Sequence, residues 1–258
     1  MQRNATYILG FAAVVCVVCA VVVSTAAVAL KDLQDANLSA YREQNVLEAA
    51  GFSQPGDRLS GAELEAAIAR LEVKVIDLAT GDVDPDLDVA TFDQRKASTD
   101  PANSHRVEAN RARIMRVPNN ALVYEVRDDS GVLEIVVLPI EGKGLWSMLY
   151  GFVALESDLT TIRGLTFYEQ KETAGLGGEV DNLRWKALWP GRKAFDDDGV
   201  MALQVIKGQA GPVDEAPYEV DGLSGATITS RSVTYMLQFW LGDDGFAPYL
   251  ERLRGETN

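Results

Sequence analysis

An uncharged apolar segment at residues 7–30 is the feature that most constrains how this chain can fold. It consists mainly of Ala, Val, Leu, Ile and Cys, and a helix of this length can span the hydrocarbon core of a bilayer. A cleavable signal peptide is the alternative, because Ala27-Val28-Ala29 resembles a small-x-small cleavage site. The segment is longer than the apolar core of a usual signal peptide, so we expect a retained transmembrane anchor. In either case the rest of the chain is directed to or across a membrane.

The charges beside this segment give only a slight preference for its orientation. Arg3 and the N-terminal amine lie on one side, and Lys31 and Arg42 lie on the other. The positive-inside rule then favours a cytoplasmic N-terminus. The expected organisation is a cytoplasmic N-terminus at residues 1–6, a transmembrane anchor at 7–30, a stalk at 31–50 and an extracytoplasmic domain at 51–258.

Charge, cysteine and histidine content exclude several classes of function. The net charge is −14, whereas nucleic-acid binding requires a basic face, so no nucleic-acid partner is expected. Both cysteines, Cys16 and Cys19, fall inside the apolar segment, where they are best explained as small apolar residues of a packed helix. The rest of the chain therefore has no thiols for a disulfide, zinc or iron–sulfur site. His105 is the only histidine and lies among polar residues, so we expect no histidine-based acid–base chemistry. We also expect no metal site.

Hydrophobic patterning after the anchor predicts one α+β domain. Two runs around Asp128-Asp129-Ser130-Gly131 have the pattern of a β-hairpin. The last predicted helix follows from apolar residues at helical spacing. The predicted elements are a helix at 62–71, strands at 73–78, 122–126, 132–138, 162–169 and 201–207, and a final helix with apolar residues Val233, Met236, Leu237, Trp240 and Leu241.

A stretch of small residues at 221–230 precedes this final helix and reads Asp-Gly-Leu-Ser-Gly-Ala-Thr-Ile-Thr-Ser. Small residues let a backbone approach a phosphate closely, and the N–H groups and dipole of a helix N-terminus favour one. The hydroxyl of Thr227 could itself become a phosphoester link. Taken alone, the stretch is explained more simply as a polar turn with an ordinary N-cap.

Two further segments combine glycine with residues suited to a cofactor. Residues 142–155 place glycines around an aromatic-rich run, which is either a buried turn with core aromatics or an apolar wall for a planar ring. Residues 172–178 read Glu-Thr-Ala-Gly-Leu-Gly-Gly, which is unusually rich in glycine for a loop. This loop is not the dinucleotide-binding fingerprint, because the G-x-G-x-x-G spacing is absent and no βαβ unit follows.

Together, and in this order, the segments resemble the NqrC family, the C subunit of the sodium-translocating NADH:quinone oxidoreductase. The 172–177 and 224–227 segments are shared with the wider FMN-binding domain family, whereas 92–97 and 144–147 are typical of the quinone reductase. One departure is Ala174, where the family usually has proline; we expect a more flexible loop that still binds. The segments that carry the resemblance are the N-terminal anchor, Phe-Asp-Gln-Arg-Lys-Ala at 92–97, Gly-Leu-Trp-Ser at 144–147, Tyr150-Gly151, Glu-Thr-Ala-Gly-Leu-Gly at 172–177 and Ser-Gly-Ala-Thr at 224–227.

The resemblance implies an FMN-binding domain of the α+β class, with a mainly antiparallel sheet and flanking helices, behind a single transmembrane helix. It implies FMN joined through its phosphate to Thr227 by a separate flavin transferase. Asp221 is expected to guide that transferase or to fix the turn, and Lys207 is either a phosphate partner or an ordinary surface lysine. The expected cofactor-binding residues are Gly175 and Gly177 for close backbone approach, Leu176 and Trp146 for contact with the ring, Glu172 and Thr173 for its polar edge or ribityl chain, and Ser224, Gly225 and Ala226 beside the attachment point.

The resemblance also implies a place and partners. The chain would be a single-pass protein of a bacterial inner membrane with its soluble domain in the periplasm. It would carry electrons from a membrane-bound iron–sulfur centre to the flavin of the B subunit, towards ubiquinone and coupled to sodium export, with the B, D and E subunits as its main partners. Flavin supplies the redox chemistry, so no catalytic residue of the chain itself is expected. The alternatives are the G subunit of the Rnf electron-transport complex, which the Gly-Leu-Trp-Ser segment disfavours, and a cofactor-free extracytoplasmic scaffold domain.

Overall fold

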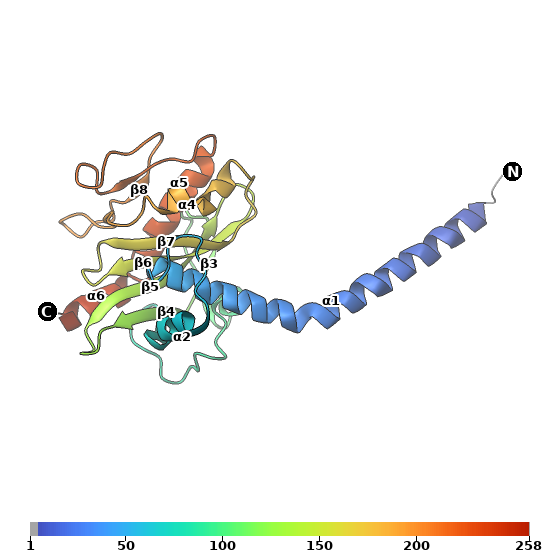
Figure 1. Ribbon diagram of the computed structural model, residues 1–258, viewed down its shortest axis with the longest axis horizontal. Helices are drawn as coiled ribbons and strands as arrows, with labels where there is room; N and C mark the ends of the chain where they lie inside the picture. The colour runs from blue at the N-terminus through green and yellow to red at the C-terminus, as the bar shows by residue number, and fades with distance from the viewer. Residues whose placement is uncertain (1–4, 258) are drawn as a thin grey trace. The chain divides into compact units, whose positions relative to one another are not determined.

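The computed structural model describes residues 5–257 and contains two compact units, Met1–Glu43 and Gln44–Asn258. Helix α1 (Ala5–Ala49) forms the described part of the first unit, and its end belongs to the second (Figure 1). Within the described range, α1 is the one helix long and apolar enough to cross a membrane. It is therefore a candidate membrane span. Of the expected cytoplasmic segment at residues 1–6, residues 1–4 lie outside the part of the chain that the structure describes.

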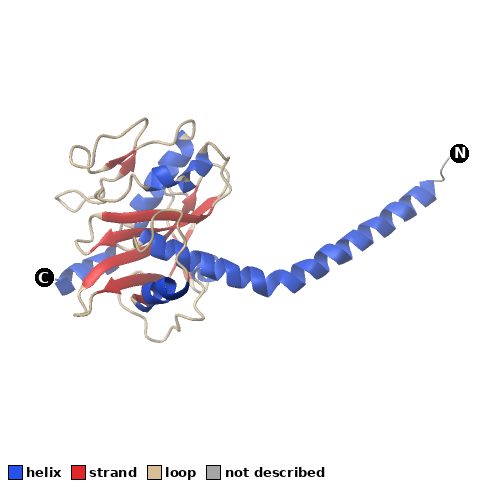
Figure 2. Cartoon of the chain, viewed as in Figure 1, coloured by secondary structure: helices blue, strands red, loops and turns tan. Residues whose placement is uncertain are grey.

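The second unit is built on a five-stranded antiparallel sheet with strand order β1-β4-β5-β6-β7. Figure 2 shows its strands in red, with helices beside them. The predicted hairpin is confirmed, because β4 and β5 pair with Tyr124 opposite Val137. The strand predicted at 162–169 also forms as expected. The mainly antiparallel α+β class is thus confirmed. The strands are β1 (Leu71–Asp77), β4 (Asn120–Arg127), β5 (Leu133–Lys143), β6 (Met148–Glu156) and β7 (Ile162–Glu169).

Both faces of this sheet are covered, which explains why β5 and β6 are apolar almost throughout. Successive strand residues point to opposite faces. Along β5, Val136 and Leu138 belong to the main core with α5 (Thr227–Trp240) and α6 (Ala247–Thr257), whereas Val137 packs in a second cluster with Val46 and Ala49. Residues 44–50, expected as the end of a stalk, therefore belong to the folded domain.

Shorter elements connect and cover the sheet. Strands β2 and β3 pair antiparallel, whereas β8 and β9 pair parallel. The shorter elements are α2 (Gly61–Ala69), α3 (Gln94–Thr99), β2 (Ser104–Arg106), β3 (Arg116–Pro118), a 3₁₀ helix η1 (Gly177–Asp181), α4 (Leu183–Lys186), β8 (Gln204–Val205) and β9 (Glu219–Val220).

The strand predicted at 132–138 continues to Lys143 in β5, and the bounds of two further predictions were wrong for reasons that the structure shows. The strand predicted at 201–207 is regular only over β8, because its partner β9 is two residues long and the N–H of Val205 donates to the hydroxyl of Thr234. The helix predicted to reach residue 71 ends at Ala69, because Leu71 is already the first residue of β1 and pairs with Val126 of β4. In both cases a tertiary partner determines where the element ends.

A close approach between β7 and the end of α1 gives a direct test of this packing. An added Cβ at Gly164 would lie 2.5 Å from the carbonyl oxygen of Ala49. We therefore expect Gly164→Ala to lower the free energy of unfolding by about 1–3 kcal/mol, the usual cost of overpacking. Gly255→Ala is the matched control, because a Cβ there meets no heavy atom within 4 Å. Urea unfolding of the full chain in detergent measures both; an equally stable Gly164→Ala chain would contradict the packing.

Candidate functional site

The Ser-Gly-Ala-Thr segment lies at the start of helix α5, as the sequence predicted. Thr227 is the first residue of the helix and is exposed. The N-cap residue is Ala226, which makes no side-chain capping hydrogen bond, so the ordinary polar N-cap is not what the structure shows. Gly225 has a φ of 71°, a conformation that favours glycine, and thereby turns the chain into the helix.

The hydroxyl groups of this segment differ in their accessibility. Thr229 is 1 % exposed and donates a hydrogen bond to the carboxylate of Glu172 at 2.8 Å. Ser230 is also buried, and its Oγ accepts a hydrogen bond from the backbone N–H of Leu223. Ser224 and Thr227 are exposed. Of the two threonines, only Thr227 is therefore exposed, and among residues 5–257 no protein group holds it in the way that Glu172 holds Thr229.

The carboxylate of Glu172 connects this segment to the Gly-Leu-Trp-Ser turn. Its two oxygens accept hydrogen bonds from the backbone N–H groups of Leu145, Trp146 and Ser147 at 3.2, 2.9 and 3.1 Å, in addition to the Thr229 hydroxyl. Burial by itself raises the pKa of the Glu172 carboxyl, but these hydrogen bonds outweigh it and hold the pKa below its usual range. Glu172 is therefore a charged structural link between three segments.

Two glycines make room for this carboxylate. An added Cβ at Gly144 would lie 2.7 Å from Oε1 of Glu172, and one at Gly177 would lie 2.8 Å from Oε2. Gly177 is buried, and the atoms nearest to an added Cβ there belong to the side chains of Glu172 and Thr229. Gly175, in contrast, is exposed and has a φ of 76°, and an added Cβ there would meet no heavy atom within 4 Å. Thr173 is also exposed, in the same loop.

Apolar side chains are exposed on the segments that Glu172 joins. Trp146 is 67 % exposed and Leu176 is 43 % exposed, although both are large and apolar. A Cβ at Gly225 would lie 2.8 Å from Cδ2 of Leu176, so the glycine-rich loop contacts the start of α5. Leu145 and Ile228 are similarly exposed, and sequence reasoning did not select them. The signal was present for Ile228, an apolar residue directly after Thr227 in a polar stretch.

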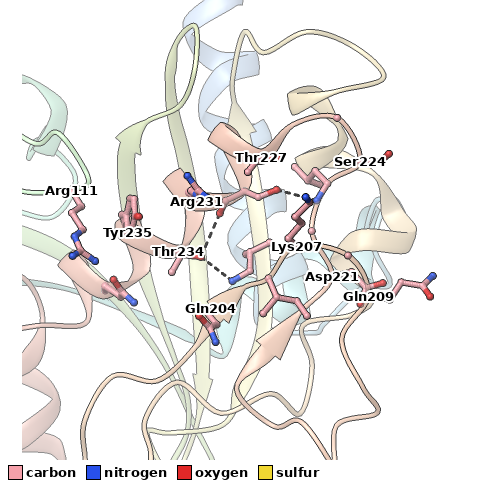
Figure 3. A pocket seen from close by; sticks show the side chains of 18 residues that line it. Arg111, Gln204, Lys207, Gln209, Asp221, Ser224, Thr227, Arg231, Thr234 and Tyr235 are labelled. Carbon is pink, nitrogen blue, oxygen red and sulfur yellow. Dashed lines mark hydrogen bonds between the residues drawn. The ribbon is translucent and has the colours of Figure 1, made fainter.

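Thr227 also lines a cavity of about 810 Å³ (Figure 3). Ser224 and Gly225 share this lining, whereas the other predicted cofactor-binding residues are not part of it. Sequence reasoning selected Lys207 but missed Arg231, which lies one helical turn after Thr227. Three basic side chains line the cavity: Arg111, Lys207 and Arg231.

Asp221 fixes the turn before this segment, one of the two roles considered for it. Its Oδ1 accepts a hydrogen bond from the N–H of Ala210, and its carbonyl oxygen accepts one from the indole of Trp185. Further away, Arg95 of the 92–97 segment forms an ion pair with Glu169 at 2.7 Å and lies over the ring of Tyr150. That segment therefore supports the sheet where β6 begins and β7 ends.

Comparison with known proteins assigns this arrangement to a class. The FMN-binding domain family matches residues 144–242, which contain the Gly-Leu-Trp-Ser turn, Glu172 and all of α5. The chain is thus a membrane-anchor candidate followed by a domain of the FMN-binding class.

Full-length relatives define the family within this class. The chain is 45 % identical over 257 residues to the C subunit of the Na(+)-translocating NADH-quinone reductase of Pseudomonas aeruginosa, and the match spans 98 % of this chain and 97 % of the relative. It is 44 % identical to the same protein of Vibrio vulnificus, over 95 % of this chain and 94 % of that one. The crystal structure of Shewanella oneidensis NqrC superposes with a TM-score of 0.75 at 40 % identity, covering 83 % of this chain and 96 % of that one. The chain belongs to the NqrC family of Na(+)-translocating NADH-quinone reductases, as its sequence resemblance indicated.

Replacing Glu172 tests its role as the link between segments. Glu172→Gln removes the charge and presents an amide N–H₂ group to hydrogen-bond donors, so we expect a loss of about 1–3 kcal/mol in unfolding free energy at pH 7. Because the folded-state pKa is lowered, the wild-type carboxylate contributes stability above its unfolded pKa and loses it as the pH falls through the folded pKa.

The stability difference between wild type and Glu172→Gln should therefore shrink below about pH 4. Urea unfolding at several pH values measures it. The exposed Glu215 provides the control, since Glu215→Gln should change stability by no more than about 0.5 kcal/mol. A pH-independent difference would show that the charge of Glu172 is not what stabilises the site.

Proposed function

We propose that the chain is a flavoprotein electron carrier that holds FMN through a phosphoester to the hydroxyl of Thr227. The observation that carries this proposal is the exposure of Thr227 as the first residue of α5, beside a buried Thr229 whose hydroxyl is already bonded to Glu172. A phosphate at this position meets the N–H groups of the first helical turn and the positive end of the helix dipole.

The residues around Thr227 fit a flavin. Exposed Trp146 and Leu176, with Leu145 and Ile228, offer apolar surface to a planar ring that would otherwise remain in contact with water. The open space at Gly175 permits close backbone approach. Bound FMN supplies the electron transfer, and the chain positions it. Glu172 contributes by fixing the backbone that carries Trp146, and its direct contact with the ring or ribityl chain remains a prediction, as does that of Thr173.

We infer the place of this carrier from its family and its anchor. Within a Na(+)-translocating NADH-quinone reductase, the chain passes electrons towards ubiquinone in contact with its neighbours in the complex, principally the B, D and E subunits. A flavin transferase attaches the FMN from a donor whose flavin phosphate is activated as an anhydride: the Thr227 oxygen bonds to that phosphorus, the anhydride bond breaks, and the second phosphate group leaves while the hydroxyl proton is lost to solvent. The candidate span in α1 holds the protein in the bacterial inner membrane as a single-pass protein, with the domain in the periplasm.

Thr227 is tested by covalent flavin on a denaturing gel. The chain co-expressed with a flavin transferase should give a fluorescent band, which Thr227→Val removes because the nucleophilic oxygen is gone, whereas Thr227→Ser retains it. Thr229→Val is the control at a neighbouring threonine and should keep the band if the protein folds, which circular dichroism checks. A band that persists in Thr227→Val would place the link on another hydroxyl.

The periplasmic placement is tested with a single engineered thiol. The natural cysteines, Cys16 and Cys19, lie in the apolar part of α1, so Ser130→Cys places the only thiol of the domain at the exposed turn between β4 and β5. A membrane-impermeant maleimide should label it in cells whose outer membrane alone has been permeabilised. Lysed cells give the total reactivity, and labelling seen only after lysis would place the domain in the cytoplasm.

A further inference from the structure

The cavity beside Thr227 runs along one face of helix α5. Thr227, Arg231 and Tyr235 follow one another at four-residue spacing and line it from the helix, while residues 204–209 line the opposite wall (Figure 3). Residues four apart in a helix lie one above the other. The lining residues of α5 extend from Thr227 to Gln238, so the cavity is a groove that begins beside Thr227 and continues for about three helical turns.

This groove has an excess of positive charge in a chain whose net charge is −14. Arg111, Lys207 and Arg231 line it, against a single carboxylate, Asp221, which already accepts a hydrogen bond from Ala210. Within the part of the chain that the structure describes, none of the three cations forms an ion pair with a carboxylate. Basic side chains gathered in a groove without carboxylate partners attract an anionic ligand.

The position of Arg231 favours binding of an anionic ligand at the end of the groove beside Thr227. Helical side chains lean towards the N-terminus of their helix, so Arg231 covers the turn that begins at Thr227. Lys207 lies on the opposite wall of the groove at this end (Figure 3). The guanidinium of Arg111 lies instead over the ring of Tyr235, 5.5 Å from its centroid, further along the groove.

We propose that Arg231 and Lys207 bind the phosphate group of FMN, both before and after its attachment to Thr227. The proposal rests on the function proposed above and names the residues that recognise the ligand. A guanidinium offers paired donors that match phosphate oxygens, and an ammonium adds a second charge. Together with the first-turn N–H groups of α5, they would surround the phosphate on the side of the groove.

The test compares FMN with riboflavin, which lacks the phosphate. Full chain produced without the transferase is titrated with each compound, and quenching of flavin fluorescence gives the two dissociation constants. We expect wild type to bind FMN at least about tenfold more tightly than riboflavin, the size of one charge-assisted hydrogen bond. Arg231→Gln and Lys207→Gln should each lower this ratio, and the double variant should bring it close to one.

The affinity for riboflavin serves as the internal control, because it should stay the same in every variant that folds correctly. Arg106→Gln combined with Arg184→Gln removes the same charge at exposed positions outside the groove and should leave the ratio unchanged. A ratio near one in wild type, or a wild-type ratio in the Arg231/Lys207 double variant, would overturn the proposal. Covalent flavin that persists in Thr227→Val would instead overturn the proposed function, so the two failures are distinguishable.

Discussion

The site depends on one buried carboxylate and the donors that surround it. Glu172 joins backbone and side-chain groups that lie 25 to 57 residues away in sequence. A buried charge is costly unless it is fully hydrogen-bonded, and here three N–H groups and one hydroxyl satisfy it. Removing the donors of the aromatic turn or of α5 would leave the carboxylate short of hydrogen bonds, so each of these two segments helps to hold the loop that contains Glu172. The start of α5 and the aromatic turn are thereby fixed in relation to each other by groups of the chain itself.

The rest of the domain provides the rigid base that this link requires. Covering both faces of the sheet anchors β5 and β6, whose connecting turn contains the backbone donors. On one face, the side chains of α5 such as Met236 and Leu237 are fully buried, which fixes the helix that begins at Thr227. A site set on rigid elements holds its geometry better than one set on free loops.

The sequence allowed the elements to be predicted where their patterns are local. The β4–β5 hairpin, β7 and the start of α5 follow from alternation, turn residues and helical spacing. The short extent of β8 did not, because it is set by its partner strand and by Thr234. The structural role of Glu172 as a link between segments was not predicted, because its hydrogen-bond donors come from parts of the chain distant in sequence. Its predicted contact with the cofactor stays a prediction. Arg231 carried no pattern of its own and became informative only beside the groove.

The donors to Glu172 from the aromatic turn are backbone N–H groups, and this separates two properties of the same residues. The side chains of Leu145 and Trp146 take no part in these hydrogen bonds, so their identities can change without loss of the framework. The peptide groups of the turn thus fix its position relative to Glu172, whereas its side chains determine the polarity of the surface that the turn exposes. Related domains could therefore diversify in the environment they offer a redox group while keeping the same underlying architecture.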